Sequence, residues 1–145
     1  MKREQPGVWI TGASSGIGKS AAIEFAKTGA KVFASARRVS ELDRLNQELD
    51  SEKLSVEIFP CNVASQSNVD QTVKRISTIS KIDCLINNAG ITSFKLAEDN
   101  SINEINDIIN TNLLGSIYTI KSVLPQMIAN GGGTIINILS VVTKK

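Results

Sequence analysis

A glycine-rich turn near the start of the chain has the residue types and the spacing needed to hold a phosphate group. The segment TGASSGIG at residues 11–18 follows the apolar run 8–10 and opens a helical pattern that reaches residue 28. Gly12, Gly16 and Gly18 let the backbone approach a ligand where a Cβ would collide. The unpaired N–H groups and the positive dipole end of the first helical turn favour a negative charge. The turn therefore predicts a diphosphate site.

Two arginines follow the next strand-like segment. In a dinucleotide fold this turn faces the adenosine ribose, where an acidic side chain would bind the 2′-hydroxyl of NAD. Ala36 occupies that position here, followed by Arg37 and Arg38. A guanidinium clamps a phosphate through two N–H donors, which favours NADP(H), with Arg37 as the main contact and Ser14, Ser15 and Arg38 assisting. The alternative is that both arginines are solvated side chains in a surface turn.

Strand and helix patterns alternate along the whole chain. Short β-branched or apolar runs predict strands at 7–10, 31–35, 55–60, 84–87 and 134–140. Helical patterns cover 16–28, 40–49 and 67–80, and a long stretch at 101–130 predicts two helices or one bent near Asn112. Gly29 would end the first helix, and Ser65 or Ser67 would cap the third. This order predicts one α/β domain, a Rossmann-type doubly wound parallel sheet with helices on both faces.

Composition excludes several classes of function. The 145 residues carry a net charge of +2 without a basic stripe and only 4% aromatic residues, so nucleic-acid binding is not expected. No apolar run is long enough to span a bilayer, and no signal peptide is recognisable, so we expect a cytoplasmic protein that binds no membrane. The chain has no histidine, which excludes a histidine-based triad, and we expect no metal site. Cys61 and Cys84 are expected to be reduced, buried core residues.

Four segments, in this order, resemble the short-chain dehydrogenase/reductase family. They are residues 11–18, residues 87–90 (NNAG), Asn112 with Gly115, and Ser140 after the apolar run 135–138. Within the family the pattern is most similar to that of 3-oxoacyl-[acyl-carrier-protein] reductases. The resemblance implies the first five strands of a sheet that has seven in the family. It also implies a nicotinamide cofactor bound across the carboxyl ends of the strands.

The resemblance implies a role for each matching residue. Gly12, Gly16 and Gly18 would form the diphosphate turn, with Ile17 near the nicotinamide, and Asn62 and Val63 would meet the adenine. Asn88, Ala89 and Gly90 would line the adenosine ribose side and brace the central strand. The family usually has Asp at position 62, but the amide oxygen of Asn62 can also accept a hydrogen bond from the adenine amino group.

Two further residues match positions that the family uses in catalysis. Asn112 would distort its helix and thereby hold a water in a proton relay, and Ser140 would bind the substrate carbonyl or alcohol. Without the resemblance, Asn112 could be an ordinary helix cap, and Ser140 a strand-end serine that satisfies loop backbone.

The family's proton donor is a tyrosine followed four residues later by a lysine. That pair would lie about a dozen residues beyond Ser140, whereas only five residues follow it here. Tyr118 and Lys121 are three apart and precede Ser140, so Tyr118 is expected to be a packing residue. We therefore expect residues 1–145 to be the NADP(H)-binding part of a reductase, without the catalytic helix and substrate lid, and inactive on their own. The 101–130 region would then expose apolar surface.

The expected function is that of an NADP(H)-dependent oxidoreductase that interconverts a small-molecule ketone and a secondary alcohol. The full-length form is expected to be a homodimer or homotetramer. The alternative is a catalytically inert NADP(H)-binding domain with a sensing or structural role.

Overall fold

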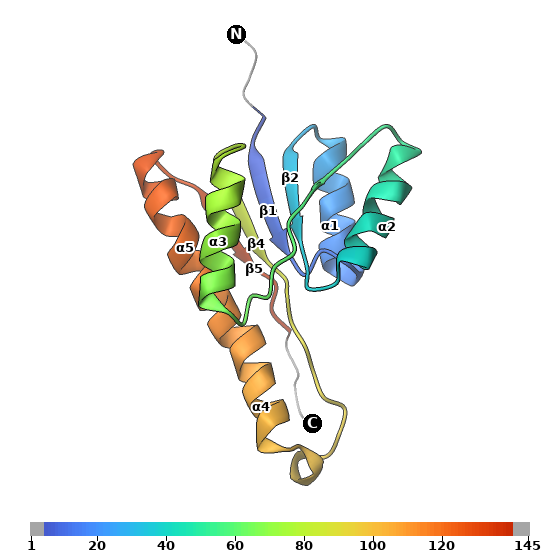
Figure 1. The fold of residues 1–145 in the computed structure, drawn as a ribbon, viewed down its shortest axis with the longest axis vertical. Coiled ribbons are helices and arrows are strands. Elements are labelled where there is room, and N and C mark those ends of the chain that lie inside the picture. The colour runs from blue at the N-terminus through green and yellow to red at the C-terminus, as the bar shows by residue number, and fades with distance from the viewer. Residues whose placement is uncertain (1–4, 141–145) are drawn as a thin grey trace.

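The fold is built on one parallel five-stranded sheet. The computed structural model describes residues 5–140. The strands are β1 (Gly7–Thr11), β2 (Lys31–Ser35), β3 (Glu57–Ile58), β4 (Cys84–Asn87) and β5 (Thr134–Asn137), and they lie in the order β3-β2-β1-β4-β5 (Figure 1). All four strand pairings are parallel. The carboxyl ends of all five strands therefore meet at one edge of the sheet, as the alternating pattern predicted.

Helices cover both faces of this sheet. They are α1 (Gly16–Lys27), α2 (Val39–Asp50), α3 (Gln66–Ser77), α4 (Ile102–Ile109) and α5 (Gly115–Ala129). Figure 1 shows α1 and α2 on one face, with α3 and α5 on the other. The predicted fold class, a doubly wound α/β sheet, is confirmed.

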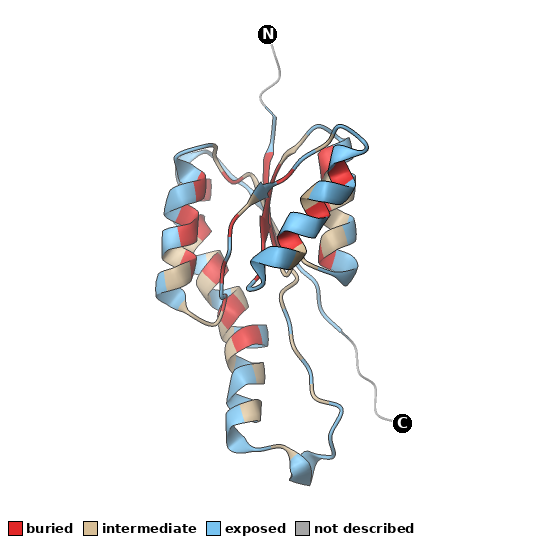
Figure 2. Ribbon diagram, turned by 45° about the vertical axis from the view of Figure 1, so that its right-hand side comes forward, coloured by how far each residue is buried: buried red, intermediate tan, exposed pale blue. Residues whose placement is uncertain are grey.

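Alternation along the central strands divides the core into two layers. Val8 and Ile10 pack with α1 and α2, whereas Trp9 between them packs with α3 and α5. This follows from the period of two of a strand, which sends successive side chains to opposite faces. Trp9 is fully buried and donates its indole N–H to Ser35 Oγ at 2.8 Å. Figure 2 shows the buried residues concentrated where the helices meet the sheet.

Local signals place the helix ends. Gly29 has φ of 81°, and the hydrogen bonds from its N–H to Ala26 O and from Ala30 N–H to Phe25 O form the glycine-based end predicted for α1. Ser65 caps α3 by accepting from Asn68 N–H, which decides between the two serines considered from the sequence. α1 and α3 end at residues 27 and 77, slightly before the predicted ends.

Two strands are shorter than their apolar runs. β3 covers Glu57–Ile58 instead of 55–60, and β5 ends at Asn137 instead of at 140. β3 is an edge strand that pairs with β2 alone, and Pro60 has no N–H to donate to a ladder.

Burial of the cysteines also differs from the prediction. Both thiols are free, but Cys84 is only half-buried, whereas Cys61 is buried.

The predicted 101–130 helix is two helices joined by a π-helical turn at Asn110–Leu114. α4 extends away from the sheet beside the segment 91–101 (Figure 1, Figure 2), and none of its residues is buried. Several apolar residues of α4, the π turn and α5 are exposed, among them Ile102, Leu113 and Ile128. This confirms the exposed apolar surface expected from the sequence. Tyr118 packs at the edge of the α3–α5 core, as predicted.

Candidate functional site

A cleft of about 320 Å³ opens at the carboxyl edge of the sheet. Its walls come from the β1–α1 turn, the turn after β2, the segment after β3, the segment after β4, and the π turn. The lining residues are Gly12, Ser14, Ser15, Ile17, Ala36, Arg37, Arg38, Cys61, Asn62, Val63, Asn88, Ala89, Gly90, Ile91 and Thr111. The structure thus brings together every residue predicted to bind the cofactor except Gly16 and Gly18. Their individual roles stay predictions.

Glycine is required in the β1–α1 turn for two different reasons. Gly12 has φ of 66°, and a Cβ there would lie 2.8 Å from the Cα of Ala89. A Cβ on Gly18 would collide with the Asn88 side-chain nitrogen and with the carbonyl of Gly12. Gly16 also has positive φ, 55°, but nothing lies within 4 Å of its Cβ position. Gly12 and Gly18 therefore serve close packing, and Gly16 leaves open space beside the first turn of α1.

The N-terminus of α1 is suited to an anion. Ser15, the N-cap, makes no side-chain capping hydrogen bond, and the first turn contains no acidic residue. The first N–H groups of a helix have no partner within the helix, and they carry the positive end of its dipole. A diphosphate would satisfy them, so the turn fits the group that the sequence predicted.

Thr11 and Asn88 brace the turn from β4. Thr11 Oγ1 accepts from the backbone N–H groups of Asn88 and Ala89, both at 3.1 Å. Asn88 Nδ2 donates to Thr11 O at 3.2 Å and to Gly12 O at 3.0 Å. The prediction gave Asn88 a bracing role but missed Thr11. The available signal was a hydroxyl at the last position of a buried strand directly before the glycine turn.

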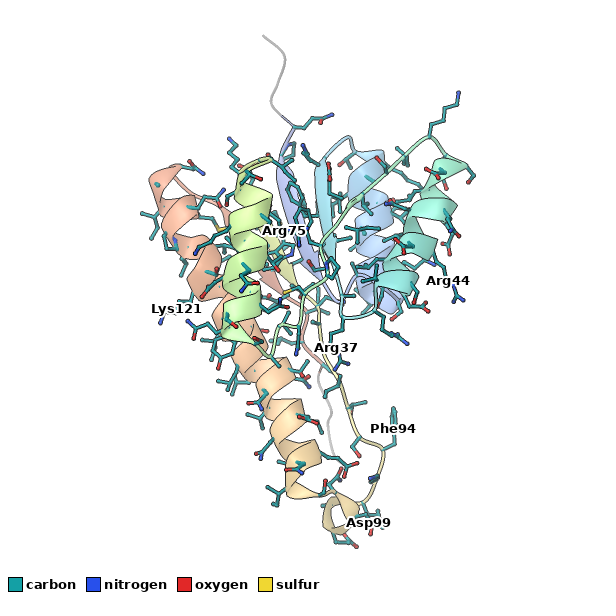
Figure 3. All side chains as sticks on the ribbon, in the orientation of Figure 1. Arg37, Arg44, Arg75, Phe94, Asp99 and Lys121 are labelled. Carbon is teal, nitrogen blue, oxygen red and sulfur yellow. The ribbon has the colours of Figure 1, made fainter. Side chains whose placement is uncertain are left out.

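Arg37 and Arg38 lie at the mouth of the cleft. Both are exposed, and neither forms an ion pair or a hydrogen bond with another residue in the part of the chain that the structure describes. Figure 3 shows Arg37 at the end of the sheet where the strands finish. Ala36 is buried beside them, so no carboxylate occupies the position next to the arginines. Two uncompensated guanidinium groups at this place suit a second phosphate.

Asn62 and Val63 follow β3 at the far end of the cleft. Val63 is buried, and a Cβ on Gly115 of α5 would lie 2.7 Å from its Cγ2, so the two segments are in close contact. Asn62 Oδ1 accepts from Ala64 N–H at 3.2 Å. The amide oxygen that the sequence assigned to the adenine amino group therefore already has one partner within its own loop.

Asn112 lies inside the π turn and holds the segment after β4. Its Nδ2 donates to Ile91 O and its Oδ1 accepts from Ile91 N–H, both at 2.8 Å. It does not cap a helix, so the capping alternative is wrong. Asn112 itself does not line the cleft, but Ile91 does. The distortion of the helix at this asparagine agrees with the resemblance.

Ser140 is exposed, three residues after β5, and does not line the cleft. The end of β5 is fixed by Asn87, whose carbonyl accepts from Ile138 N–H at 2.8 Å. Asn87 Nδ2 donates to Asn137 Oδ1 at 3.0 Å, and buried Thr119 donates to Asn87 Oδ1 at 2.7 Å. This network links α5, β4 and β5, and the sequence did not predict it.

Other lining residues were also missed. Cys61 lines the cleft, but burial raises the pKa of its thiol, so it remains a neutral wall rather than a nucleophile. Ile91 and Thr111 belong to positions that no motif singled out. Among residues 5–140 there is no cluster of three or more potential metal-ligating side chains, and no helix there has the length and apolarity to cross a bilayer.

Comparisons with known proteins agree with this geometry. A family model described as short chain dehydrogenase matches residues 7–145. Dehydrogenase/reductase SDR family member 7 of Mus musculus is 33% identical over 92% of this chain and 41% of its own length. The 3-oxoacyl-[acyl-carrier-protein] reductase FabG of Thermotoga maritima is 35% identical over 98% of this chain and 58% of its own length.

Solved structures give the same result. A metagenomic short-chain oxidoreductase crystallised with NADP superposes with a TM-score of 0.88 at 28% identity, covering 94% of this chain and 63% of that one. The chain spans about half the length of the curated relatives it matches. The match of the family model over nearly all of its residues shows that this chain belongs to the short-chain dehydrogenase family.

Proposed function

We propose that the cleft binds NADP(H) and that the protein is an oxidoreductase acting on a ketone or a secondary alcohol. The observation that carries this proposal is the composition of the cleft wall. The N-terminus of α1 has no side-chain cap there, and the turn after β2 places two unpaired arginines beside it. These fit a diphosphate and a 2′-phosphate, respectively. The NADP complex of the metagenomic relative supports the same cofactor. The cofactor would supply the hydride to a ketone, or accept it from a secondary alcohol.

Asn112 and Ser140 are the chain's candidate catalytic residues. The hydrogen bonds of Asn112 to Ile91 support a role in shaping the helix beside the cleft. Ser140 is exposed after β5 and outside the cleft lining, so its role in binding substrate oxygen rests on the family resemblance. Residues 1–145 contain no Tyr-x-x-x-Lys pair, so we propose that this stretch alone binds cofactor without turnover. A cytoplasmic location also stays a prediction.

Arg37→Ala tests the choice of cofactor. Loss of a bidentate guanidinium–phosphate contact should weaken NADPH binding by about 10- to 100-fold, because each 1.4 kcal/mol corresponds to a factor of ten. NADH affinity should change by less than about threefold, because NADH carries no 2′-phosphate. Fluorescence titration of the reduced nicotinamide measures both. Arg44→Ala is the matched control, since Arg44 is exposed on α2 and pairs with Glu41 outside the cleft.

An unchanged NADPH affinity in Arg37→Ala would contradict the assignment of the arginine to the 2′-phosphate. NADPH oxidation with a panel of ketones separates the two functional alternatives. Cofactor binding without turnover by residues 1–145 is the expected result. Turnover would contradict our proposal that this stretch lacks its proton donor.

A further inference from the structure

The order of the strands decides which end of the cleft receives the base. The β1–α1 turn lies at the centre of the sheet, Arg37 follows β2, and β3 is the outermost strand on that side. A dinucleotide with its diphosphate at the central turn and its 2′-phosphate at Arg37 must therefore place its base beside Val63, after β3. This step rests on the proposed NADP(H) site.

Thr111 lines the cleft from the π turn. The next residue, Asn112, is bonded to Ile91 in the segment after β4. One turn later on the same helix, Gly115 packs directly against Val63. Residues about one turn apart share a helix face. Thr111 thus lies between Val63 and the segment after β4, which together enclose the adenosine half of the cleft.

The hydroxyl of Thr111 differs from those of the other buried helical threonines. Thr72 Oγ1 donates to Asn68 O at 2.9 Å, and Thr119 Oγ1 donates to Asn87 Oδ1 at 2.7 Å. Thr111 is only 8% exposed and lines the cleft, yet its hydroxyl has no hydrogen-bond partner among residues 5–140. The Oγ1 atom of Thr111 is not fully enclosed by the protein, so a ligand in the cleft can reach it.

A hydroxyl in this situation is suited to a ligand. A threonine in a regular helix usually satisfies its hydroxyl with a carbonyl of the preceding turn, so a cleft-lining hydroxyl without a protein partner is free to hydrogen-bond a ligand. The π turn changes the helix register at Thr111, and the hydroxyl is left for the cleft. We propose that Thr111 is a further cofactor-binding residue, whose hydroxyl hydrogen-bonds the adenosine half of NADP(H).

Thr111→Val tests this proposal, because valine keeps the shape of threonine and removes only the hydroxyl. The probes are NADPH and 2′,5′-ADP, which contains the adenosine half but no nicotinamide. We expect both dissociation constants to rise about five- to tenfold, the usual effect of losing one hydrogen bond. Thr111→Ser should restore binding to within about twofold. Thr78→Val is the control, since its hydroxyl bonds to Arg75 O at the end of α3 and does not line the cleft.

The outcomes separate this inference from the function on which it rests. Unchanged binding of both probes by Thr111→Val would overturn the inference while leaving the NADP(H) site intact. Weaker NADPH binding with unchanged 2′,5′-ADP binding would overturn it as well, because the hydroxyl would then contact the nicotinamide half. Failure of the wild-type protein to bind NADPH would instead refute the proposed function. Thermal denaturation of each variant verifies that it is folded.

Discussion

The two ends of this molecule differ in how their apolar residues are used. Around α1 and α2, the leucines and alanines that face the sheet are buried, and the turns before these two helices form part of the cleft wall. Along α4 and the π turn, comparable side chains are exposed: Ile102 is 71% exposed and Leu113 is 54% exposed. The same residue types therefore hold the fold together in one region and contribute open surface in the other.

This difference separates two halves of the molecule. The packed half consists of the sheet with α1 and α2, and the extended half consists of α4 and the π turn. The glycine turn, its Thr11 and Asn88 braces and the arginine turn all stand on the packed half. Among residues 5–140, only the Asn112–Ile91 contact joins the cleft to the extended half by side-chain hydrogen bonds. The exposed apolar residues of α4 and the π turn, such as Ile102 and Leu113, are open surface in residues 5–140. A dimer or tetramer of the full-length form stays a prediction.

The largest expected effect comes from making one truncation in each half. Leu45→Ala removes a fully buried side chain from α2 and should lower the free energy of unfolding by about 2–5 kcal/mol. Leu113→Ala makes the same change at an exposed position and should lower it by less than about 0.5 kcal/mol. Urea denaturation measures both. Equal losses would contradict the contrast between the halves.

A smaller effect is expected where the halves are joined. Asn112→Ala removes both hydrogen bonds to Ile91 and should weaken the segment after β4 by about 1–2 kcal/mol. Amide hydrogen exchange at Ile91 should then be about tenfold faster or more. Asn110→Ala is the control, because the Asn110 side chain makes no hydrogen bond among residues 5–140. Equal exchange at Ile91 in both variants would show that the Asn112 contacts do not hold this segment.

The smallest effect concerns the start of α4. Lys95, and then the N–H and hydroxyl of Ser101, lower the pKa of Glu104 from its ordinary 4.5 to about 2. Because the folded pKa is depressed, the stabilisation is complete above pH 4.5 and is lost as the pH falls through about 2. An NMR titration of the Glu104 carboxyl should have its midpoint near that lower value, and Lys95→Ala should move the midpoint upward. A wild-type midpoint near 4.5 would refute the ion pair of Glu104 with Lys95 and its hydrogen bonds with Ser101.

The features that the sequence predicted correctly depend on neighbours along the chain. The glycine turn, the glycine end of α1, the serine cap of α3 and the alternating strand patterns are local, and the structure has each of them. The distortion near Asn112 was also predicted, from the family resemblance. β3 and β5 were predicted too long, because the length of a strand is set by its pairing with the neighbouring strand and not by apolar character alone.

The features that the sequence missed depend on partners distant in the chain. Thr11 bonds to residues 77 and 78 positions away, and Thr119 bonds to Asn87 across 32 positions. No local pattern identifies such pairs. Thr111 was missed for a different reason, because its importance lies in a hydroxyl that lacks a partner, and that is visible only once the surrounding hydrogen bonds are known.

The most direct test is an NMR titration of the protein with NADPH, following backbone amides. The cleft at the β1–α1 turn should respond, with saturable shifts at Gly12, Ser14, Arg37 and Asn62 and little change along Ile102–Ile109. A second cavity, of about 520 Å³, lies between the segment after β4 and α4, and is lined by residues such as Phe94 and Asp107. Shifts concentrated there, or no saturable shift at the glycine turn, would contradict an NADP(H) site at the carboxyl edge of this sheet.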